Sequence, residues 1–494
     1  MSPSVEPFDE AKYKALMDGL ECNEVLLSDT KLENPVFRFD AEYFNKEVLS
    51  LVKRIKTKAN RLISSSFNVS KLAGFEFTEY FTPQNMSSND FYIALTSKNI
   101  QQNRLDLDDY ITIDKRIADT YLKRSSLKKN DVVLSYTGEY RRALTLFEDG
   151  YQLGPNVCRL TAIDEKINAN YLSVFFNSTV GQKILDREKT LSAQPTVAMS
   201  RIRAIRVPLF EKLQIEIEKY VTISNAMQVE AKELFSDASQ VLVKIFDISS
   251  IPTIGGSIKS INDSFKSTGR LDAEYYQPKY DALFKILAKI STKKLGGENG
   301  IVDMMKSIEP GSEAYVDEGI PFIRVSNMSK YEITEPEIKL DSKVIPSPEK
   351  LFPKKDTILF SKDGSVGIAY KVEDDMSVIT SGALLHLTVR DTSEVLPDYL
   401  TLVLNSPVVQ LQAERDSNGA IIQHWKPSEI ENVVIPILDM ETQKKIAAKV
   451  QESFALRRKS KQLLEYAKKA VEMAIEQGED VALEWLKDKA DKEV

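Results

Sequence analysis

The segment RFDAEYF at residues 38–44 returns as RLDAEYY at residues 270–276, about 230 residues later. A second pair keeps nearly the same spacing, because AIRVP at residues 204–208 returns as NVVIP at residues 432–436. Landmarks that recur in the same order at one spacing indicate a duplicated domain. A protein with two related domains is suited to a target with two sites.

Two further landmarks lie inside each copy. LKKNDVVLSYTG at residues 127–138 corresponds to FPKKDTILFSKDG at residues 352–364, and NYL at residues 170–172 corresponds to DYL at residues 398–400. Residues 45–126 of the first copy and residues 277–350 of the second copy share almost no identities. The sequence therefore predicts a duplicated frame that carries two unlike contents.

The landmarks divide the chain into seven segments. In order these are an N-terminal leader packing on the frame (1–37), a first domain (38–208), a spacer helix (209–247), a linker (248–269), a second domain (270–436), a second spacer helix (437–478) and a C-terminal tail (479–494). Within the leader we predict a helix over 10–22 and a strand over 25–28, and the first domain should open with a helix over 38–61. Both domains mix short β-like runs with helices, so the fold class is α+β.

The two spacer segments have the pattern of long coiled-coil helices. The first places apolar or small residues in steps of three and four, at Ile217, Val221, Ser224, Met227, Ala231, Leu234, Ala238, Val241 and Ile245. The second does the same at Ile446, Val450, Ser453, Leu456, Ser460, Leu463, Ala467, Ala470 and Ala474. Helices of about 35 residues would be roughly 50–55 Å long. Such helices most simply pack on each other, as an antiparallel pair between the domains; the alternative is two long helices inside one globular core.

Bulk composition indicates an intracellular protein. Lys and Arg total 66 against 73 Asp and Glu, a net charge of −7, which argues only weakly against nucleic acid as a partner. Cys22 and Cys158 have no metal-ligand spacing and fit a reducing cytosol. The polar N-terminus does not resemble a signal peptide, and no apolar run approaches the about 20 residues needed to span a bilayer. We therefore predict a cytoplasmic protein with no membrane partner.

Catalytic motifs are almost absent from the sequence. NPVF at residues 34–37 lacks the second proline of an adenine-methylating loop, and no glycine-rich segment has phosphate-loop spacing. His386 and His424 have no partner cysteine, so a zinc site is not expected. We predict no catalytic, cofactor-binding or metal-binding residue in this chain. Two alternatives stay open at this point: a self-sufficient DNA methyltransferase or nuclease with degenerate motifs, and a coiled-coil scaffold with no DNA role.

A binding design fits the remaining features, and DNA fits them best. Loops that follow the β-like runs are rich in the side chains that pair with base edges and phosphates. The candidate DNA-binding residues of the first domain are Lys98, Asn99, Tyr136, Arg141, Arg142, Gln194, Arg201 and Arg203. Those of the second domain are Arg324, Asn327, Lys362, Ser365, Gln423, His424 and Lys426.

The repeated landmarks resemble the DNA specificity subunit of type I restriction–modification systems. The resemblance is carried by RLDAEYY at residues 270–276, ILFSKDGSVG at residues 358–367 and the exit VIP at residues 434–436, in that order and in duplicate. The first copy departs from the pattern, because LSYTGEY at residues 134–140 lacks the second glycine of the loop.

The resemblance implies two target-recognition domains separated by two long antiparallel helices. Each domain would read one half of a split, asymmetric site in double-stranded DNA. It also implies two modification (methyltransferase) subunits that bring S-adenosylmethionine, and restriction (motor–nuclease) subunits that use ATP and Mg. The helix pair would act as a spacer, so removing about one turn from within 217–245 should shorten the gap between half-sites.

Overall fold

The computed structural model describes residues 8–19, 24–32, 38–138, 140–190, 192–252, 255–417 and 423–493. The chain divides into two compact units. Unit 1 comprises Met1–Met227 and Arg458–Val494, and unit 2 comprises Gln228–Arg457. Each unit contains one copy of the repeat together with part of both long helices. Among the described residues, no helix is long and apolar enough to cross a membrane.

The sheets of unit 1 are mostly antiparallel. One has the order β2-β11-β8-β9, with strands at Phe67–Lys71, Val157–Ala162, Val132–Ser135 and Ala143–Thr145. The other has the order β6-β3-β10-β7, with strands at Ile111–Asp114, Phe91–Leu95, Tyr151–Leu153 and Ser126–Leu127; only β10 and β3 run parallel in it. Short pairs join β4 (Ile100–Gln101) to β5 (Arg104–Leu105) and β1 (Asn60–Leu62) to β12 (Arg206–Pro208). Strand β8 is buried at every position, which explains its unbroken apolar run.

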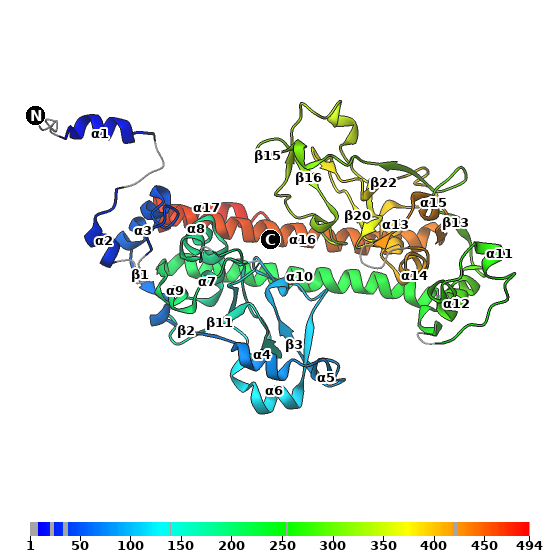
Figure 1. Ribbon diagram of the computed structural model, residues 1–494, viewed down its shortest axis with the longest axis horizontal. Coiled ribbons are helices and arrows are strands. Elements are labelled where there is room, and N and C mark those ends of the chain that lie inside the picture. The colour runs from blue at the N-terminus through cyan, green and yellow to red at the C-terminus, as the bar shows by residue number, and fades with distance from the viewer. Residues whose placement is uncertain are drawn as a thin grey trace, which may run out of the picture. The chain divides into compact units, whose positions relative to one another are not determined.

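The helices of unit 1 form two groups. Three short ones border the second sheet: α4 (Gly74–Tyr80), α5 (Pro83–Met86) and α6 (Lys115–Tyr121) (Figure 1). Four others pack on the first sheet: α3 (Lys46–Thr57), α7 (Ala169–Asn177), α8 (Thr179–Glu188) and α9 (Met199–Ala204). Unit 1 is therefore a layered mixed α/β structure.

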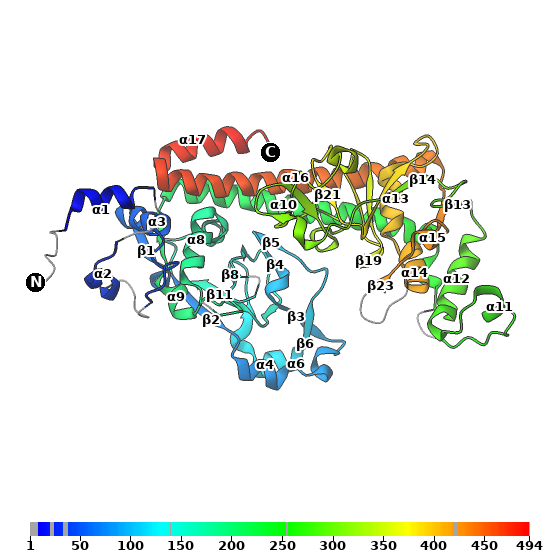
Figure 2. The ribbon, with the colours of Figure 1, turned by 45° about the horizontal axis from the view of Figure 1, so that its top comes forward.

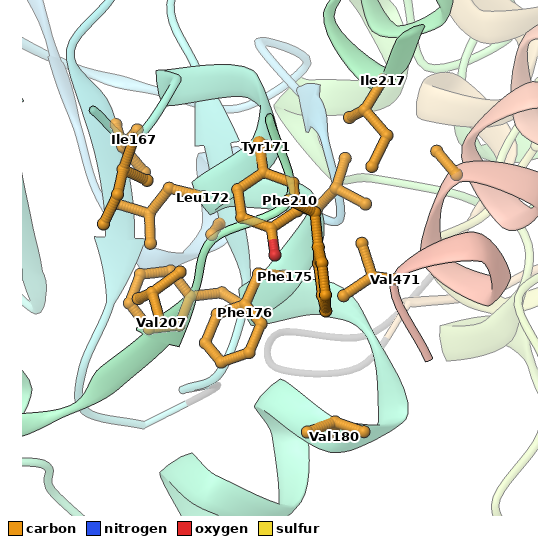
Figure 3. Packing of buried hydrophobic residues seen from close by; sticks show 14 of the residues in the cluster. Ile167, Tyr171, Leu172, Phe175, Phe176, Val180, Val207, Phe210, Ile217 and Val471 are labelled. Atoms are coloured by element: carbon orange, nitrogen blue, oxygen red, sulfur yellow. The ribbon is translucent and has the colours of Figure 1, made fainter. Parts of the chain in front are cut away.

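Helix α7 lies at the centre of the unit 1 core (Figure 3). The rings of Phe175 and Phe176 are fully buried there, beside Ile217 and Val471 from the two long helices. The turn from α7 to α8 is so tight that a Cβ at Gly181 would lie 1.9 Å from the carbonyl oxygen of Phe175. Glycine is therefore required at this close approach of two backbones.

Unit 2 repeats this arrangement. One sheet has the antiparallel order β14-β22-β18-β20, with strands at Val302–Lys306, Leu384–Val389, Ile358–Ser361 and Ala369–Lys371. The other has the order β15-β17-β16-β21, with strands at Tyr315–Val316, Lys339–Leu340, Ile320–Ile323 and Ile379–Thr380; only β16 and β21 run parallel. Short antiparallel pairs join β13 (Thr292–Lys294) to β24 (Val434–Pro436) and β19 (Asp363–Gly364) to β23 (Gln423–His424).

The helices of unit 2 match only part of the unit 1 set, because no α-helix lies between β14 and β22, a stretch that the structure describes in full, where α4, α5 and α6 would be expected. The unit 2 helices are α11 (Phe265–Thr268), α12 (Pro278–Leu287), α13 (Pro397–Leu404), α14 (Pro407–Asp416) and α15 (Pro427–Ile430). Trp425 is the largest side chain that is fully buried, and its ring packs on Phe360 with centroids 5.9 Å apart. The core of unit 2 also receives side chains from both long helices.

Hydrogen bonds at equivalent positions confirm the duplication. The hydroxyl of Tyr171 donates to the carbonyl oxygen of Pro208 at 2.9 Å, and the hydroxyl of Tyr399 donates to that of Pro436 at 2.8 Å. In both units this bond fixes the first core helix to the strand that leads into a long helix. The predicted mixed α/β fold with an internal repeat is therefore confirmed.

The duplication extends into a region where the two sequences share almost nothing. Strand β3 is followed by a turn in which Asn99 Oδ1 accepts from the Thr96 N–H at 2.9 Å. Strand β16 is followed by the same turn, in which Asn327 Oδ1 accepts from the Arg324 N–H at 3.0 Å. A backbone pattern is thus preserved although the side chains around it differ.

The long helices are α10 (Glu211–Ile245) and α16 (Met440–Gln477), which lie side by side in antiparallel directions (Figures 1 and 2). The Oγ atoms of Ser224 and Ser460 are 2.7 Å apart, and Ser453 Oγ donates to the carbonyl oxygen of Ala231 at 2.6 Å. Seven residues forward on α10 therefore correspond to seven residues back on α16. The predicted pair of long antiparallel helices is confirmed.

The predicted seam of α10 is correct at Ala231 and Ala238 but is displaced by one residue at the positions around Ala238. Phe235 and Leu242 are buried rather than their predicted neighbours Leu234 and Val241, and Ile245 is 44% exposed. The buried positions are Ala231, Phe235, Ala238 and Leu242, so steps of four and three alternate in the opposite order to the predicted one.

The predicted C-terminal tail begins with a helix, α17 (Glu479–Ala490) (Figure 2). One carboxylate oxygen of Glu479 accepts from the N–H groups of Lys212 and Leu213, at 2.7 and 2.9 Å. These donors belong to the first turn of α10, where backbone N–H groups have no partner within the helix. Tyr220 further donates to Asp491 at 2.6 Å, so α17 is part of the unit 1 core.

Two expectations for the N-terminal region are wrong. Residues 27–32 form a helix, α2 (Leu27–Leu32), where a strand over 25–28 was expected. The helix expected over 38–61 spans only α3, because residues 38–44 form a turn before it. The expected helix over 10–22 is present as α1 (Glu10–Met17), while residues 20–23 and 34–37 lie outside the described part of the chain.

Candidate nucleic-acid interface

Each unit has a pair of loops at the end of its central buried strand. In unit 2 the Trp425 N–H donates to the carbonyl oxygen of Lys362 at 2.8 Å, and β19 pairs with β23. In unit 1 the Val197 N–H donates to the carbonyl oxygen of Tyr136 at 2.9 Å, which is the equivalent bond in the other copy of the repeat. We call residues 136–138, 140–142 and 194–197 the paired loops of unit 1. Residues 362–367 and 423–426 are the paired loops of unit 2.

The paired loops of unit 2 contain an ionic cluster. Lys362 is 9% exposed and its ammonium pairs with the Asp363 carboxylate, which also meets Nδ1 of His424 at 2.8 Å. Burial would raise the pKa of Asp363, but hydrogen bonds from Lys362 and His424 outweigh burial and hold that pKa below its usual value. The His424 side chain is 62% exposed. Asp363 thus stays charged and orients one buried and one exposed donor.

Three other predicted residues of unit 2 lie on the same loops. Ser365 and Gln423 are exposed, and Gln423 is the strand partner of Gly364. Lys426 is exposed and only loosely paired, with Nζ 3.9 Å from Glu429. The fold therefore brings Lys362, Ser365, Gln423, His424 and Lys426 together. Polar donors on a pair of surface loops are suited to contacts with phosphates and base edges.

The paired loops of unit 1 carry different chemistry. Arg141 forms an ion pair with Asp186 and lies 4.9 Å above the ring of Tyr140. Burial and a hydrogen bond to Asp186 raise the pKa of Tyr140 to about 12, so this phenol stays a donor. The ring of Tyr136 faces the ammonium of Lys71 at 5.2 Å. In this unit the loops present aromatic faces and an arginine.

Gln194 and Arg142 complete the unit 1 group. Gln194 is exposed and its amide nitrogen lies near Gly138, whose φ of +71° permits the turn. Arg142 is half-buried, and its backbone N–H donates to Ser135 Oγ at 3.0 Å. The sequence-based set Tyr136, Arg141, Arg142 and Gln194 is therefore assembled in one place.

Several predicted residues brace the fold. Asn99 is 1% exposed, and its amide donates to the carbonyl oxygens of Asp106 and Asp109 at 2.9 and 2.7 Å. The Arg201 side chain is 10% exposed and donates to the carbonyl oxygen of Glu188 at 3.1 Å. We therefore remove both from the proposed DNA-binding set: the Asn99 amide already makes two internal bonds, and the Arg201 guanidinium is buried against Glu188.

The side chains of Arg203 and Asn327 each take part in a hydrogen bond within the domain. Arg203 donates to the carbonyl oxygen of Val69 at 2.6 Å, although the residue as a whole is exposed. Asn327 is half-buried and caps the turn after β16. Both residues stay in the proposed DNA-binding set, since neither is fully buried.

Lys98 and Arg324 are exposed but stand apart from the paired loops. Lys98 pairs with Asp109 at 3.3 Å, and both side chains are more than three-quarters exposed. Arg324 has no side-chain ion pair or hydrogen bond within the described residues. Exposed ion pairs contribute little to stability, so both cations are available to a phosphate.

The sequence missed the acidic residues that organise both loop pairs. Asp363 lies inside the quoted motif ILFSKDGSVG but was not singled out, and Asp186 is far from its partners along the chain. The signal for Asp363 was its position between two candidate donors. No sequence signal connects Asp186 to Tyr140 and Arg141, because only the fold brings α8 to this loop.

A metal site is not found in the described part of the chain, where no group of three or more His, Cys, Asp or Glu side chains is suitably placed. His386 is instead buried in β22, with Nε2 2.8 Å from Thr380 Oγ1. Burial lowers the pKa of His386 to about 4, so the imidazole is neutral at physiological pH.

Together, these observations show a repeated frame that carries a different pair of polar loops in each copy. Residues 301–466 match the sequence model of the family described as "Type I restriction modification DNA specificity domain". This part of the chain is therefore a DNA specificity domain of the type I restriction–modification family, as the resemblance implied. The function of such a domain is DNA recognition. No curated protein sequence gives a significant match.

Solved structures of similar fold include two specificity subunits. The S subunit of a type I restriction–modification system from M. genitalium is 13% identical, with a TM-score of 0.33 over 87% of this chain and 95% of that one. The HsdS subunit from Thermoanaerobacter tengcongensis is 15% identical, with a TM-score of 0.26 over 87% and 96%. The type IIG restriction endonuclease BpuSI is 10% identical, with a TM-score of 0.20 over 73% and 44%.

Proposed function

We propose that this chain is the DNA specificity subunit of a type I restriction–modification complex, in which residues 38–208 and 270–436 each read one half of a bipartite, asymmetric site. The observation that carries the proposal is the family match of residues 301–466, together with the recurrence of the same frame in the first half of the chain. A repeated frame with unlike loops is suited to two unlike half-sites.

The paired loops are the proposed base-reading surfaces. In unit 2, Lys362 offers an ammonium donor beside Asp363, which suits acceptors such as guanine O6 and N7, and the bond from Nδ1 to Asp363 orients the exposed His424 imidazole. In unit 1, Tyr136 and Arg141 offer an aromatic face and a guanidinium. Because the two surfaces differ in charge and shape, the half-sites should differ in sequence.

Exposed cations outside the loops would supply phosphate contacts. Lys98 and Arg324 are the proposed phosphate ligands, with Lys426 at the edge of the paired loops. Contacts of this kind give affinity that falls with salt but carry no sequence information. Lys98→Ala or Arg324→Ala should therefore weaken binding to all sequences alike and reduce its salt dependence.

We assign catalysis to partner subunits. Two modification subunits would bring S-adenosylmethionine and methylate adenine, and restriction subunits would bring ATP and Mg for translocation and cleavage. The complex would act in the cytoplasm. The chain itself would bind none of these cofactors.

Methylome sequencing tests this proposal. A host that carries this chain with its modification subunits should show methylated adenines in one bipartite motif with a gap of constant length. The purified chain, given S-adenosylmethionine and DNA alone, should methylate nothing. Methylation by the chain alone, or a motif without a gap, would contradict the proposal.

The long helices give the proposed gap its length. Because Ser224 lies opposite Ser460 and Ala231 opposite Ser453, a deletion that keeps the seam must remove one heptad from each helix. Removal of residues 225–231 and 453–459 together meets this condition. A heptad is about 10 Å long, so the gap should shorten by roughly three base pairs.

The matched control removes residues 225–231 alone, which leaves the two seams out of register and should lower stability without giving a defined new gap. A methylome in which the paired deletion leaves the gap unchanged would refute the spacer role.

A further inference from the structure

A lysine ends the edge strand of one four-stranded sheet in each unit. Lys71 is the last residue of β2, in the sheet β2-β11-β8-β9, and Lys306 is the last residue of β14, in the sheet β14-β22-β18-β20. The two lysines lie within residues 45–126 and 277–350, where the copies share almost no identities. The correspondence between them is therefore visible in the strand pairing and not in the sequence.

The strand pairing places the two lysines at the same position of the sheet. Through β11, Lys71 is aligned with Leu134, the second-last residue of β8. Through β22, Lys306 is aligned with Phe360, the second-last residue of β18. In both sheets the edge strand and the central strand run in the same direction, because each is antiparallel to the strand between them. Both lysines therefore lie at the end of the sheet from which the paired loops leave.

The loop that leaves the central strand is closed in the same way in both units. The Ser135 N–H donates to the carbonyl oxygen of Arg142 at 2.9 Å, and the Ser361 N–H donates to that of Ile368 at 2.9 Å. The same backbone frame thus fixes the lysine-bearing strand and the start of the loop. Each unit has a cation at one defined place beside its loops.

The surface around Lys71 is positively charged. Lys71 is exposed, and its ammonium lies 5.2 Å from the ring centroid of Tyr136, in the paired loops. Arg203 donates to the carbonyl oxygen of Val69 at 2.6 Å, so a second cation lies near the same end of β2. Lys71 forms no ion pair with any carboxylate that the structure describes. An anion from outside the chain would find this ammonium available.

Lys306 is also exposed and unpaired. Its Cε and a carboxylate oxygen of Glu309 both lie beside Gly382, yet Lys306 forms no ion pair within the described part of the chain. Neither lysine therefore contributes a salt bridge to the stability of its domain. Exposed lysines can also protect an edge strand from pairing with another chain, which is the alternative role for both.

We propose that Lys71 and Lys306 each bind one phosphate of the DNA backbone, beside the base pairs that the paired loops of the same unit read. The inference rests on the proposed function and adds to it two phosphate sites at equivalent places in the two half-sites. Neighbouring strands are about 4.8 Å apart, so the edge and central strands end roughly 10 Å from each other. A loop in the major groove, which is about 12 Å wide, has a phosphate backbone on each side. A cation at this distance to one side of the loop would meet that backbone.

One phosphate contact changes the salt dependence of binding by a predictable amount. The logarithm of the affinity falls with the logarithm of the salt concentration, with a slope of about −0.9 for each contact. Between about 50 and 200 mM salt, one contact therefore accounts for about a threefold loss of affinity. Lys71→Ala and Lys306→Ala should each remove one such factor, and the double variant should remove two. Protection of an edge strand predicts no change in the salt dependence.

The test measures DNA binding by the complex of the full-length chain with its modification subunits. The probe is a duplex that carries the motif mapped by methylome sequencing, with single neutral methylphosphonates placed in turn along each half-site. Several of these should weaken binding by the wild-type complex. Lys71→Ala should abolish the response at one position, in the half-site that unit 1 reads. Lys306→Ala should abolish it at the equivalent position of the other half-site.

The matched controls are two exposed lysines at the opposite end of the central strands. Lys129 and Lys355 precede β8 and β18, and they too occupy equivalent places in the repeat. Lys129→Ala and Lys355→Ala should retain the wild-type salt dependence and every methylphosphonate response. Lys71→Arg and Lys306→Arg should retain both as well, because the charge is kept. Circular dichroism melting checks that all variants fold.

The methylated motif should be the same in every variant, because phosphate contacts carry no sequence information. A changed motif in Lys71→Ala would mean that this lysine orients Tyr136, and would overturn the phosphate role. An unchanged salt dependence in the double alanine variant would overturn it too. So would competition by inorganic phosphate at constant ionic strength without any methylphosphonate response, which indicates a free anion. If the wild-type complex does not bind a bipartite motif, the proposed function itself fails.

Discussion

The two units share a backbone frame, but one contact between a strand and a helix in this frame has different polar groups in each unit. In unit 1, Thr145 on β9 donates to Ser173 on α7 at 3.1 Å, and both are neutral. In unit 2 the place of Thr145 is taken by Lys371 on β20, whose Nζ lies 3.0 Å from Asp398 and 3.1 Å from Glu373. A neutral hydrogen bond has thus been replaced by a buried ion cluster.

This difference shows which contacts define the frame. Bonds from side chains to backbone, such as Tyr171 to Pro208 and Tyr399 to Pro436, occur in both units. The bonds between side chains at this contact differ. A frame fixed by backbone-directed bonds can accept new side-chain chemistry, which allows each unit to acquire its own loops.

The largest predicted effect is a loss of stability that is confined to unit 2 and depends on Lys371. Burial lowers its pKa, but Asp398 and Glu373 outweigh burial and raise it above the usual value, so the lysine is charged throughout the physiological range. Lys371→Met leaves the buried Asp398 and the half-buried Glu373 without this cation and should destabilise unit 2 by about 3–5 kcal/mol. Urea unfolding measures this loss.

A rescue variant sharpens the Lys371 prediction. The unit 1 counterparts of Lys371 and Asp398 are Thr145 and Asn170. Lys371→Thr with Asp398→Asn should therefore cost less than Lys371→Thr alone. If the free-energy costs of the two substitutions simply add, Lys371 and Asp398 are not energetically coupled and the ion cluster does not explain the loss of stability.

The next effect is acid sensitivity confined to unit 2. His386 has a pKa near 4 because it is buried, whereas its unfolded value is about 6.5. The unfolded state therefore binds the proton first, so stability falls as pH drops from about 6.5 to 4, by up to about 3 kcal/mol. The unit 1 counterpart is Cys158, whose pKa burial raises to about 12, so it stays neutral.

His386→Cys should remove this part of the acid response. Urea unfolding at pH 7 and pH 4.5 gives the change in the free energy of unfolding between the two pH values. The contribution of carboxylates to this change is the same in the wild type and in the variant. Hydrogen exchange of unit 1 amides in the same samples serves as the internal control. Equal acid losses in wild type and variant would exclude His386 as the cause.

The smallest effect should be equal in the two units. Tyr171→Phe and Tyr399→Phe each remove a buried donor from a proline carbonyl oxygen, which should cost about 1–3 kcal/mol. Unfolding followed separately in each unit by hydrogen exchange measures both. Markedly different losses in the free energy of unfolding would mean that the tyrosine–proline bond does not have the same role in the two units.

The frame could be predicted from sequence because its residues recur. Tyr171 and Tyr399 stand in the repeated landmarks NYL and DYL, and both make the same bond. The parallel pairing of β3 with β10 and of β16 with β21 could not be predicted, because the two sequences there have diverged. Backbone hydrogen bonds preserve that pattern without preserving side chains.

The candidate site was predicted less completely than the frame. Lys362 and His424 were proposed because loop donors near a repeated motif suggest recognition, and the structure brings both to Asp363. Asn99 and Arg201 were included for the same reason, although both are bonded to backbone in the interior. A single sequence does not show whether a polar residue is buried or exposed. The organising role of Asp186 depends on the packing of α8, which sequence alone does not give.

The central claim is that one frame carries two independent readers. The most direct test replaces residues 72–208 with the matching segment of another specificity subunit and maps methylated adenines in cells that contain the partner subunits. We predict that one half-site changes while the other half-site and the gap stay the same. A change in both half-sites would contradict the account.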